Sequence, residues 1–569
     1  MKKMLTLLVA GLMMVSMTAC GSKSGSSDAT LRVGSLELDG VISPIYYTTA
    51  YDGYAVDLIF DSLLDYNANS ELVPELAAEM PTVSEDGKQV TFKLKDGLKF
   101  SDGSDLTSED VRFTFEVTAD PSYTGRFGTT AQNIEGWEEF NKKGSTVEHL
   151  SGIETPDEKT IIFNLKEARN DAVADLGTTY GIISYDQFKD SYKKGNTKAI
   201  EEATTETIGS GPYKLNKYDK ASGASFVKNE NFTTNDGAYA VKNIVIQHVT
   251  DSTELEALTT DSVDLLPASL NADKVSTISS KEGYTYHDYA RAGIGYVTFN
   301  TENGATSDPA VRKALIYAIN RDGFNDSYFG WTDEASDELK EIKLGYAPKA
   351  FINPVSSLGD VVRGERKIDG LADYTYDLEK AKSILDEAGW KVGADGVREK
   401  DGQKLEIKFL ASEGNSVLET LLPLFEKDWA KELGVDLKKT TVDMNTMFSK
   451  LESTEAASEW NAAFLAVGFT GTTLTEINTM FHSSDDRLSN YAGLKDAELD
   501  ALLEKAQGTV DNDGAKAAYE KVLVKAMDDA AYYPLYANRY FDLYNNRVKN
   551  LNTSSVYSWA KAMADVTID

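Results

Sequence analysis

Residues 71–115 read ELVPELAAEMPTVSEDGKQVTFKLKDGLKFSDGSDLTSEDVRFTF, and the local structure of this stretch constrains the rest of the fold. Pro74 suits the first position of a helix and predicts a short helical turn over residues 74–77. Residues 90–95 alternate apolar and polar side chains, which is the pattern of a half-buried strand. Asp-Gly pairs at 96–97 and 102–103 predict turns. Thr107 followed three residues later by Asp110 predicts a capped helix. The stretch therefore predicts strand, turn, strand and capped helix.

The same stretch carries a family resemblance. Its succession LxPxLA, SxDG, FxLxxGxxFxDG and LxxEDVxFxF resembles the signature of the extracytoplasmic solute-binding proteins of peptide/nickel-type ABC importers, the dipeptide- and oligopeptide-binding family. Further landmarks of that family are GSGPYKL at 209–215, the FNT…DPAVRKALIYAINR segment at 299–321, and YPLY at 533–536. In the segment at 299–321 we expect Arg312 to form a structural ion pair. The landmarks extend over nearly the whole chain.

The resemblance implies an α/β, periplasmic-binding-protein-like fold of type II, cluster C, with two lobes on a hinge and an extra scaffolding domain. The implied division has lobe I formed by residues 29–62, 205–288 and 535–569, domain II by residues 63–204, and lobe III by residues 289–534. Length alone agrees, because a chain of this size is too long for one hydrophobic core.

The N-terminus has the pattern of an export signal. Lys2 and Lys3 precede an apolar run over residues 4–17, which is too short for a permanent membrane span. The following residues end at Cys20 and resemble a bacterial lipobox, which implies a signal peptide over 1–19, a lipidated Cys20 and a small-residue tether to residue 28. The alternative is a secreted protein with an incidental cysteine. Cys20 is the only cysteine of the chain, so disulfides, cysteine-based zinc sites and cysteine nucleophiles are excluded.

The net charge is −33, from 58 basic and 91 acidic residues. This balance disfavours nucleic acid as a partner, since such binding depends on Lys and Arg at phosphates. We interpret the acidity as a solvated surface that keeps an exported protein soluble.

Seven residues are candidate ligand contacts because of where the resemblance places them: Tyr46, Tyr47, Tyr51, Tyr289, Arg291, Phe469 and Thr470. The tyrosines near residue 50 lie where the family frames its cleft, and Tyr289 and Arg291 lead into the inter-lobe strand. The alternative for the aromatic residues is a place in the core or at the rim.

Many peptide-binding relatives have an aspartate just after the aromatic residue that corresponds to Phe469, and this carboxylate receives the α-ammonium group of the peptide. No acid follows Phe469 here until Glu476, which the resemblance does not place in the cleft. An oligopeptide is still the expected ligand. A sugar, an opine-like compound, a modified peptide and a metal chelate stay open as alternatives.

Metal and nucleotide sites have little support. His149, His248, His287 and His482 are far apart in sequence, whereas direct metal ligation usually needs clustered His or Cys. Pro212 directly after Gly-Ser-Gly is incompatible with a phosphate-binding loop that opens a helix. We therefore expect no metal and no cofactor.

The competing class is a secreted hydrolase, but the chain contains no G-x-S-x-G elbow and no HExxH motif. We predict a non-enzymatic binding protein that closes around a solute by a hinge motion. It would be a monomer, anchored by lipid on the outer face of the cell membrane, that delivers its ligand to the transmembrane subunits of an ABC permease. A receptor for signalling peptides would have the same fold.

Overall fold

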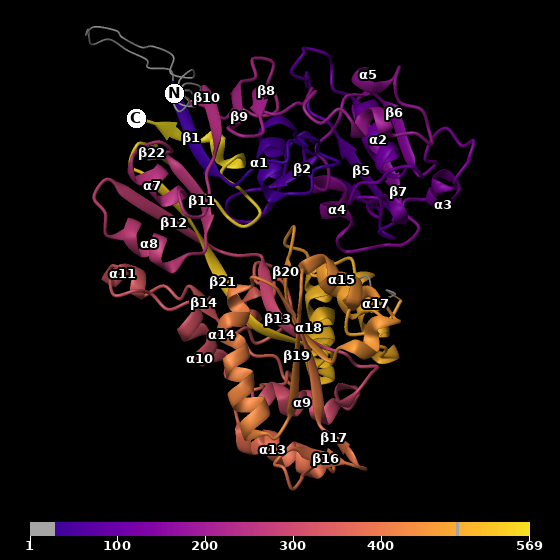
Figure 1. The fold of residues 1–569 in the computed structure, drawn as a ribbon. Helices are drawn as coiled ribbons and strands as arrows, with labels where there is room; N and C mark the ends of the chain where they lie inside the picture. Colours follow the sequence, from indigo (N-terminus) through magenta and orange to yellow (C-terminus); the bar gives the residue numbers. More distant parts are fainter. Residues whose placement is uncertain (1–28, 485–486, 488) are drawn as a thin grey trace, which may run out of the picture.

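The computed structural model describes residues 29–484, 487 and 489–569. The predicted signal peptide, Cys20 and the tether lie outside the described residues. Figure 1 shows two bodies, an upper one that contains β1 and the C-terminus and a lower one that contains β13, β18 and β20. There are two hydrophobic cores, one in the upper body and one in the lower body, and the second continues into the upper body through Leu258, Val275 and Ile278. Within the described residues, no helix combines the length and the apolar character required to cross a membrane.

The sheet of the upper body is built around β1 (Thr30–Ser35). This strand runs parallel to β10 (Asn243–His248), in register from Thr30 opposite Asn243 to Ser35 opposite His248. Beyond β10 lie two antiparallel strands, β9 (Gly223–Lys228) and β8 (Tyr213–Asp219). On the other side lies β11 (Leu265–Ser269). The helices beside this sheet are α1 (Ala50–Ile59), α7 (Glu254–Thr259) and α8 (Ala272–Ser279).

Residues 64–201 form the right side of the upper body in Figure 1. Their four-stranded sheet has the order β4 (Thr82–Val83), β5 (Gln89–Lys93), β7 (Thr160–Asn164) and β6 (Ile153–Asp157). It packs against α2 (Ser108–Thr118), whose N-cap Thr107 forms the predicted capping box with Asp110. The shorter helices are α3 (Trp137–Asn141), α4 (Ala172–Thr178), α5 (Tyr185–Phe188) and α6 (Lys198–Glu201).

The predicted helical turn at Pro74 is wrong. Pro74 ends β3 (Leu72–Pro74), which pairs with β2 (Leu64–Tyr66). The next amides donate hydrogen bonds back to the same segment, from Glu75 to the Leu63 carbonyl and from Leu76 to the Ser62 carbonyl. Because these two amides already donate to the segment before β2, residues 75–77 form an irregular turn and not a helix.

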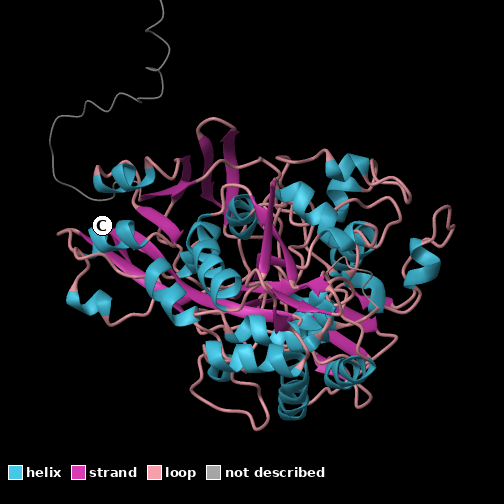
Figure 2. Ribbon diagram, turned by 60° about the horizontal axis from the view of Figure 1, so that its bottom comes forward, coloured by secondary structure: helices cyan, strands magenta, loops and turns pink. Residues whose placement is uncertain are grey.

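The lower body contains a sheet of order β19 (Asp436–Val442), β18 (Glu406–Ser412), β20 (Ala462–Gly468) and β13 (Gly293–Phe299). Helices lie on both sides of the strands, as Figure 2 shows. They pack in pairs, α9 with α13, α10 with α14 and α17 with α18. Their bounds are α9 (Pro309–Tyr317), α10 (Arg321–Tyr328), α13 (Leu378–Glu387), α14 (Ser416–Phe425), α15 (Met444–Glu452), α17 (Ala497–Gln507) and α18 (Asn512–Asp529).

The expected ion pair of Arg312 is also wrong. Its guanidinium group donates hydrogen bonds to the carbonyl oxygens of Asp529 and Thr306, at 2.7 and 2.8 Å. The Asp529 carbonyl is at the end of α18, where helical carbonyls lack partners within the helix. Arg312 therefore satisfies backbone acceptors instead of a carboxylate.

Two chain crossings join the bodies. The strand β21 (Tyr532–Asn545) pairs with β13 through its first residues and with β11 and β12 (Tyr284–Ala290) through its last ones. The second crossing is the step from β12 to β13 at residues 291–292. The two crossings lie next to each other, because the Arg291 amide donates to the Asn538 carbonyl at 2.9 Å. This arrangement has the geometry of a two-stranded hinge.

A second contact between the bodies lies away from the hinge. Asn170 donates hydrogen bonds to two carbonyls at the end of α17, those of Gln507 and Ala506, at 2.9 and 2.8 Å. Nearby, the Thr475 hydroxyl donates to Asp171 Oδ2 at 2.6 Å. We call these contacts of Asn170 and Thr475 the latch.

Candidate functional site

A cavity of about 610 Å³ lies where the two bodies meet next to the hinge. We call it the cleft cavity. Both bodies supply its lining. The lining residues are Gly34–Leu36, Ala50, Tyr51, Tyr54, Asp251, Glu254, Leu266–Asn271, Tyr289, Arg291, Ala292, Gly468, Phe469, Tyr540, Ser554, Ser555 and Ser558. Its size is within the range of small-molecule sites, about 300–1,000 Å³.

Helix α1 presents two tyrosines to the cleft cavity. Its N-cap Thr49 accepts a hydrogen bond from the Asp52 amide, and the buried Asp52 carboxylate accepts one from the Gly40 amide at 3.0 Å. These bonds fix the start of the helix against the preceding loop. Tyr51 and Tyr54 are three residues apart and therefore share one helix face.

A second aromatic wall comes from the hinge strands. Tyr289 on β12 and Tyr540 on β21 have ring centroids 6.1 Å apart. The Tyr289 hydroxyl donates to Asp542, which also accepts hydrogen bonds from Thr553 and from the Ala268 amide. Burial raises the pKa of Asp542. Its carboxylate therefore orients Tyr289 and is fully occupied by protein groups.

Arg291 is the cation of the cleft cavity. Ser555 holds its backbone on both sides, since the hydroxyl accepts a hydrogen bond from the Ala292 amide and donates one to the Ala290 carbonyl. The guanidinium group donates hydrogen bonds to the Asn538 amide oxygen, at 3.3 Å, and to the Tyr536 side chain, and it lies 5.8 Å from the centre of the Tyr540 ring. Among the described residues it forms no ion pair. Arg291 thus has donors available for an anionic group.

The acids of the cleft cavity are Asp251 and Glu254. Lys274 Nζ lies 2.5 Å from the carboxylate of Asp251 and 2.7 Å from that of Glu254. Two carboxylates thus share one ammonium group, which leaves one formal negative charge at this end. The Asp251 side chain is 87% exposed and is therefore accessible.

The structure brings together four of the seven residues that the sequence predicts as ligand contacts. Tyr51, Tyr289, Arg291 and Phe469 line the cleft cavity. Tyr46, Tyr47 and Thr470 do not. Tyr46 is buried against Tyr123, and Tyr47 lies under the guanidinium group of Arg126 at 4.2 Å. The Thr470 amide donates to Glu476 Oε1 at 2.7 Å, and the Glu476 carboxylate is occupied by this loop and by Asn353.

Sequence reasoning missed the largest part of the lining. Tyr54, Tyr540 and the serines at 554, 555 and 558 come from segments with no recognisable motif. The missed residues also include two exposed leucines. Leu36 and Leu270 are 37% and 44% exposed, and both line the cavity. Exposed leucines at a cavity wall are typical of a binding surface.

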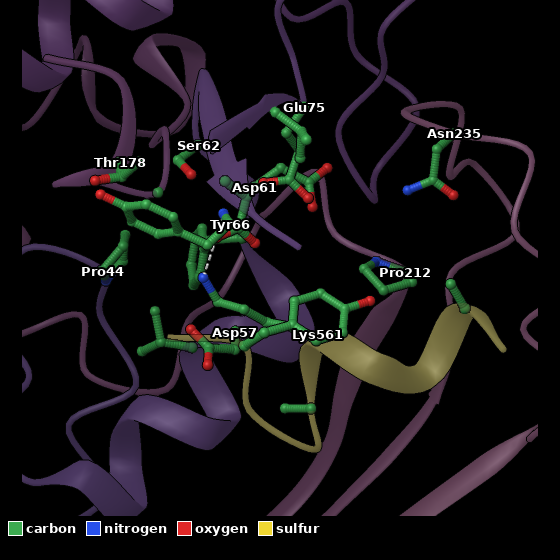
Figure 3. A pocket seen from close by; sticks show the side chains of 18 of the residues that line it. Pro44, Asp57, Asp61, Ser62, Tyr66, Glu75, Thr178, Pro212, Asn235 and Lys561 are labelled. Carbon is green, nitrogen blue, oxygen red and sulfur yellow. Dashed lines mark hydrogen bonds and ion pairs between the residues drawn. The ribbon is translucent and has the colours of Figure 1, made fainter. Parts of the chain in front are cut away.

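A second cavity, of about 210 Å³, borders α1 through Val56 and Asp57, and Figure 3 shows its lining. We call it the acidic cavity, because Asp57, Asp61, Asp65 and Glu75 face it together with Lys561 and Lys95. Lys561 binds Asp65, and the Ser558 hydroxyl donates to Asp57 at 2.9 Å. Burial raises the pKa of Asp61 to about 6 and also raises the pKa values of Asp57 and Glu75.

Neither cavity has the ligands of a metal site. Within residues 29–484, 487 and 489–569, no cluster of three His, Cys, Asp or Glu side chains could hold a metal ion. His149 has a local partner in Glu116, and His287 has one in the Thr553 carbonyl.

Comparison with known proteins assigns this architecture to a family. The sequence model of the bacterial extracellular solute-binding proteins, family 5 Middle, matches residues 71–487. The oligopeptide-binding protein AppA of Bacillus subtilis is 23% identical over 558 residues, which cover 94% of this chain and 93% of AppA. The nickel-binding periplasmic protein of Escherichia coli is 26% identical over 513 residues, 87% of this chain and 86% of that protein.

Solved structures have the same fold. The lactococcal OppA, complexed with an endogenous peptide in the closed conformation, superposes with a TM-score of 0.75 at 19% identity, over 95% of this chain and 100% of that one. The molecule is therefore a two-lobed α/β protein of the periplasmic-binding-protein type.

Proposed function

Because this chain belongs to the bacterial extracellular solute-binding proteins of family 5, the substrate-binding components of ABC transporters, we propose that it captures oligopeptides in the cleft cavity. The lobes close around the peptide and present it to the transmembrane subunits of the permease. The relatives are binding proteins and not enzymes, and the proposed role likewise involves no chemical step.

We further propose that the protein acts as a monomer held at the outer face of the membrane by a lipid on Cys20. In this proposal residues 29–62, 205–288 and 535–569 form lobe I, residues 63–204 form domain II, and residues 289–534 form lobe III. Replacing Cys20 with Ser would then release the protein from the membrane into the medium, whereas a protein that is only secreted would be released in both forms.

The observation that carries the proposal is the position of the cleft cavity. It has walls from both bodies and lies beside the two crossings of the hinge. A solute that contacts both walls stabilises the closed arrangement over the open one, because only the closed one offers both sets of contacts.

The charges of the cleft cavity fit a zwitterionic ligand. Arg291 has free donors for a carboxylate, and the Asp251–Glu254 pair has one formal charge more than Lys274 neutralises. We propose that this pair receives the peptide ammonium group in place of the aspartate that is absent after Phe469. The tyrosines, Leu36 and Leu270 would contact the peptide side chains.

A metal chelate is the second candidate. The unpaired Arg291 would bind a carboxylate of the chelator equally well, and the nickel-binding periplasmic protein is among the relatives. The chelator would have to supply the metal ligands, because the cleft cavity contains neither His nor Cys.

Native mass spectrometry of the soluble form that starts at Gly21, purified without refolding, tests the proposal. A distribution of mass increments that match short peptides is the expected result. A single increment with the isotope pattern of a metal chelate would favour the second candidate. A protein that shows no increment and binds no peptide from a mixed library would overturn the peptide assignment.

A further inference from the structure

A third cavity, of about 150 Å³, lies in the lower body and shares no lining residue with the cleft cavity. We call it the basic cavity. Its lining consists of Arg321, Lys349, Gly364, Arg366, Lys367, Ile368, Leu371, Ala372, Asp373, Tyr374, Met527 and Tyr533. Four of these residues are basic and one is acidic, although the chain as a whole has 58 basic and 91 acidic residues. The local charge is thus opposite to that of the protein.

Ion pairs account for only part of this positive charge. Arg366 binds Asp360 and Glu520, each at 2.6 Å, and is neutralised. Lys349 lies 3.6 Å from Asp373, at the rim. Arg321 and Lys367 form no ion pair among the described residues. Two cations therefore face the cavity without a carboxylate.

Arg321 is the more informative of the two, because its residue surface is only 7% exposed. Its Nη1 donates to the carbonyl oxygens of Pro348 and Pro534, at 2.5 and 2.8 Å, and its guanidinium group lies 4.5 Å from the centre of the Tyr533 ring. These partners are neutral. A buried guanidinium group is normally paired with a carboxylate or phosphate, since an uncompensated buried charge is costly.

The other walls are apolar. Ile368, Leu371, Ala372 and Met527 contribute aliphatic surface, and Tyr374 and Tyr533 contribute rings. Both tyrosine hydroxyls already donate to backbone carbonyls, Tyr374 to Met527 and Tyr533 to Tyr374. The donors left for a ligand are therefore those of Arg321, Lys349 and Lys367.

We propose that the basic cavity is a second binding site, which takes an anionic oxygen group, carboxylate or phosphate, carried on a small apolar body. The anionic group binds between Arg321 and Lys367, and the apolar body lies against Ile368, Leu371 and Met527. The volume corresponds to about five water molecules at ~30 Å³ each, which limits the occupant to a small molecule. The site is independent of the solute in the cleft.

Calorimetric titration of the full soluble protein with benzoate and with phenyl phosphate tests this site, and benzamide is the neutral control of the same shape. We expect saturable binding of at least one anion, weaker binding as the salt concentration rises, and no detectable binding of benzamide. Benzamide that binds as well as benzoate would overturn the proposal.

Two variants locate the binding without changing Arg321, whose loss would also remove the carbonyl contacts. Ala372→Trp fills the cavity and should abolish anion binding. The double variant Lys349→Gln/Lys367→Gln removes two exposed charges and should weaken it by roughly three- to tenfold. Lys343→Gln, an exposed lysine of the same lobe, is the matched control and should bind like the wild type.

Arg291→Gln separates this site from the cleft. Anion binding that survives Arg291→Gln and is lost in Ala372→Trp supports the proposal, whatever the solute of the cleft proves to be. Anion binding that is lost in Arg291→Gln would place the anion in the cleft cavity and contradict the proposal.

Discussion

The cleft cavity and the acidic cavity lie against the same helix, α1, yet their walls differ in chemistry. Tyr51 and Tyr54 face the cleft cavity, whereas Val56, Asp57 and Phe60 face the acidic one. Three of 23 lining residues are charged in the cleft cavity, against six of 24 in the acidic cavity. In the acidic cavity Lys561 forms an ion pair with Asp65 inside the protein, whereas among the described residues Arg291 in the cleft cavity forms no ion pair.

This difference indicates separate roles. Groups that are satisfied within the protein contribute to stability and to its pH dependence, whereas groups that have free donors contribute to ligand binding. Substitutions in the acidic cavity should therefore change the free energy of unfolding, and substitutions in the cleft cavity should change affinity.

The largest effect is expected for Lys561→Met. The substitution leaves the Asp65 carboxylate without its ion-pair partner, and breaking a buried pair in this way typically costs about 3–5 kcal/mol. Urea unfolding at pH 7 measures the loss. Lys220→Met, at an exposed lysine that lies 3.4 Å from Glu37, should change stability by less than about 0.5 kcal/mol.

A double variant, Lys561→Met/Asp65→Asn, should recover part of the loss because it removes the uncompensated carboxylate. A Lys561→Met protein with the stability of the Lys220→Met control would show that the acidic cavity does not depend on internal charge pairing.

The next effect concerns pH. Burial raises the pKa of Asp61 to about 6 from an ordinary value of 3.8, so the folded protein holds this proton more tightly than the unfolded chain does. The resulting stability is fully present below pH 3.8 and is lost as the pH rises to about 6, and a shift of two units corresponds to about 2–3 kcal/mol.

Asp61→Asn removes this titration and should flatten the fall in stability between pH 4 and 7, as measured by urea unfolding at both values. Asp236→Asn, an exposed residue with no side-chain hydrogen bond in the described structure, should keep the wild-type dependence. Identical pH profiles for both variants would assign the pH dependence to other groups.

The third effect is on affinity. Arg291→Gln should weaken the binding of a peptide with a free C-terminal carboxylate by about 10- to 100-fold, because a charged hydrogen bond contributes about 1.5–3 kcal/mol. The same peptide with a C-terminal amide should bind both proteins equally, as calorimetric titration would show.

Arg126→Gln is the matched control, because Arg126 also forms no ion pair within the described part of the chain but stacks on Tyr47 and Phe127 beside the acidic cavity. Its affinity should equal that of the wild type. A loss of affinity in Arg126→Gln as large as in Arg291→Gln would mean that the two cavities are not functionally separate.

The smallest effect is expected at the latch. Asn170→Ala removes one side-chain hydrogen bond between the bodies, worth about 1 kcal/mol, and should lower the apparent ligand affinity by about fivefold through a shift toward the open form. Small-angle scattering of the unliganded protein should show the same shift. Asn133→Ala, which breaks a bond of 2.9 Å to the Glu167 carbonyl within one body, should leave both quantities unchanged.

Local chemistry explains which parts of the fold could be predicted. The capping box at Thr107 involves neighbouring residues, so its pattern is visible in the sequence. The predictions at Pro74 and Arg312 failed because distant partners decide them, β2 for the first and the end of α18 for the second.

The site was predictable to a smaller extent for the same reason. Tyr46 and Tyr47 precede α1 in a turn, and contacts with Tyr123 and Arg126, which are remote in sequence, direct their rings away from the cleft cavity. The family resemblance predicts an acid just after Phe469. The pair Asp251 and Glu254 comes instead from a segment more than 200 residues earlier in the chain. Only the fold brings these segments together.

The path of β21 has a consequence for biosynthesis. The core of the upper body combines Leu31 and Val33 of the first strand with Trp559, Met563 and Val566 near the other end of the chain. Chain synthesis proceeds at about 5–20 residues per second, so these partners are made roughly 30–110 s after the first strand. Over that time the nascent chain has no complete upper lobe, so it stays open to chaperones and compatible with passage through a narrow export channel until its synthesis is nearly finished.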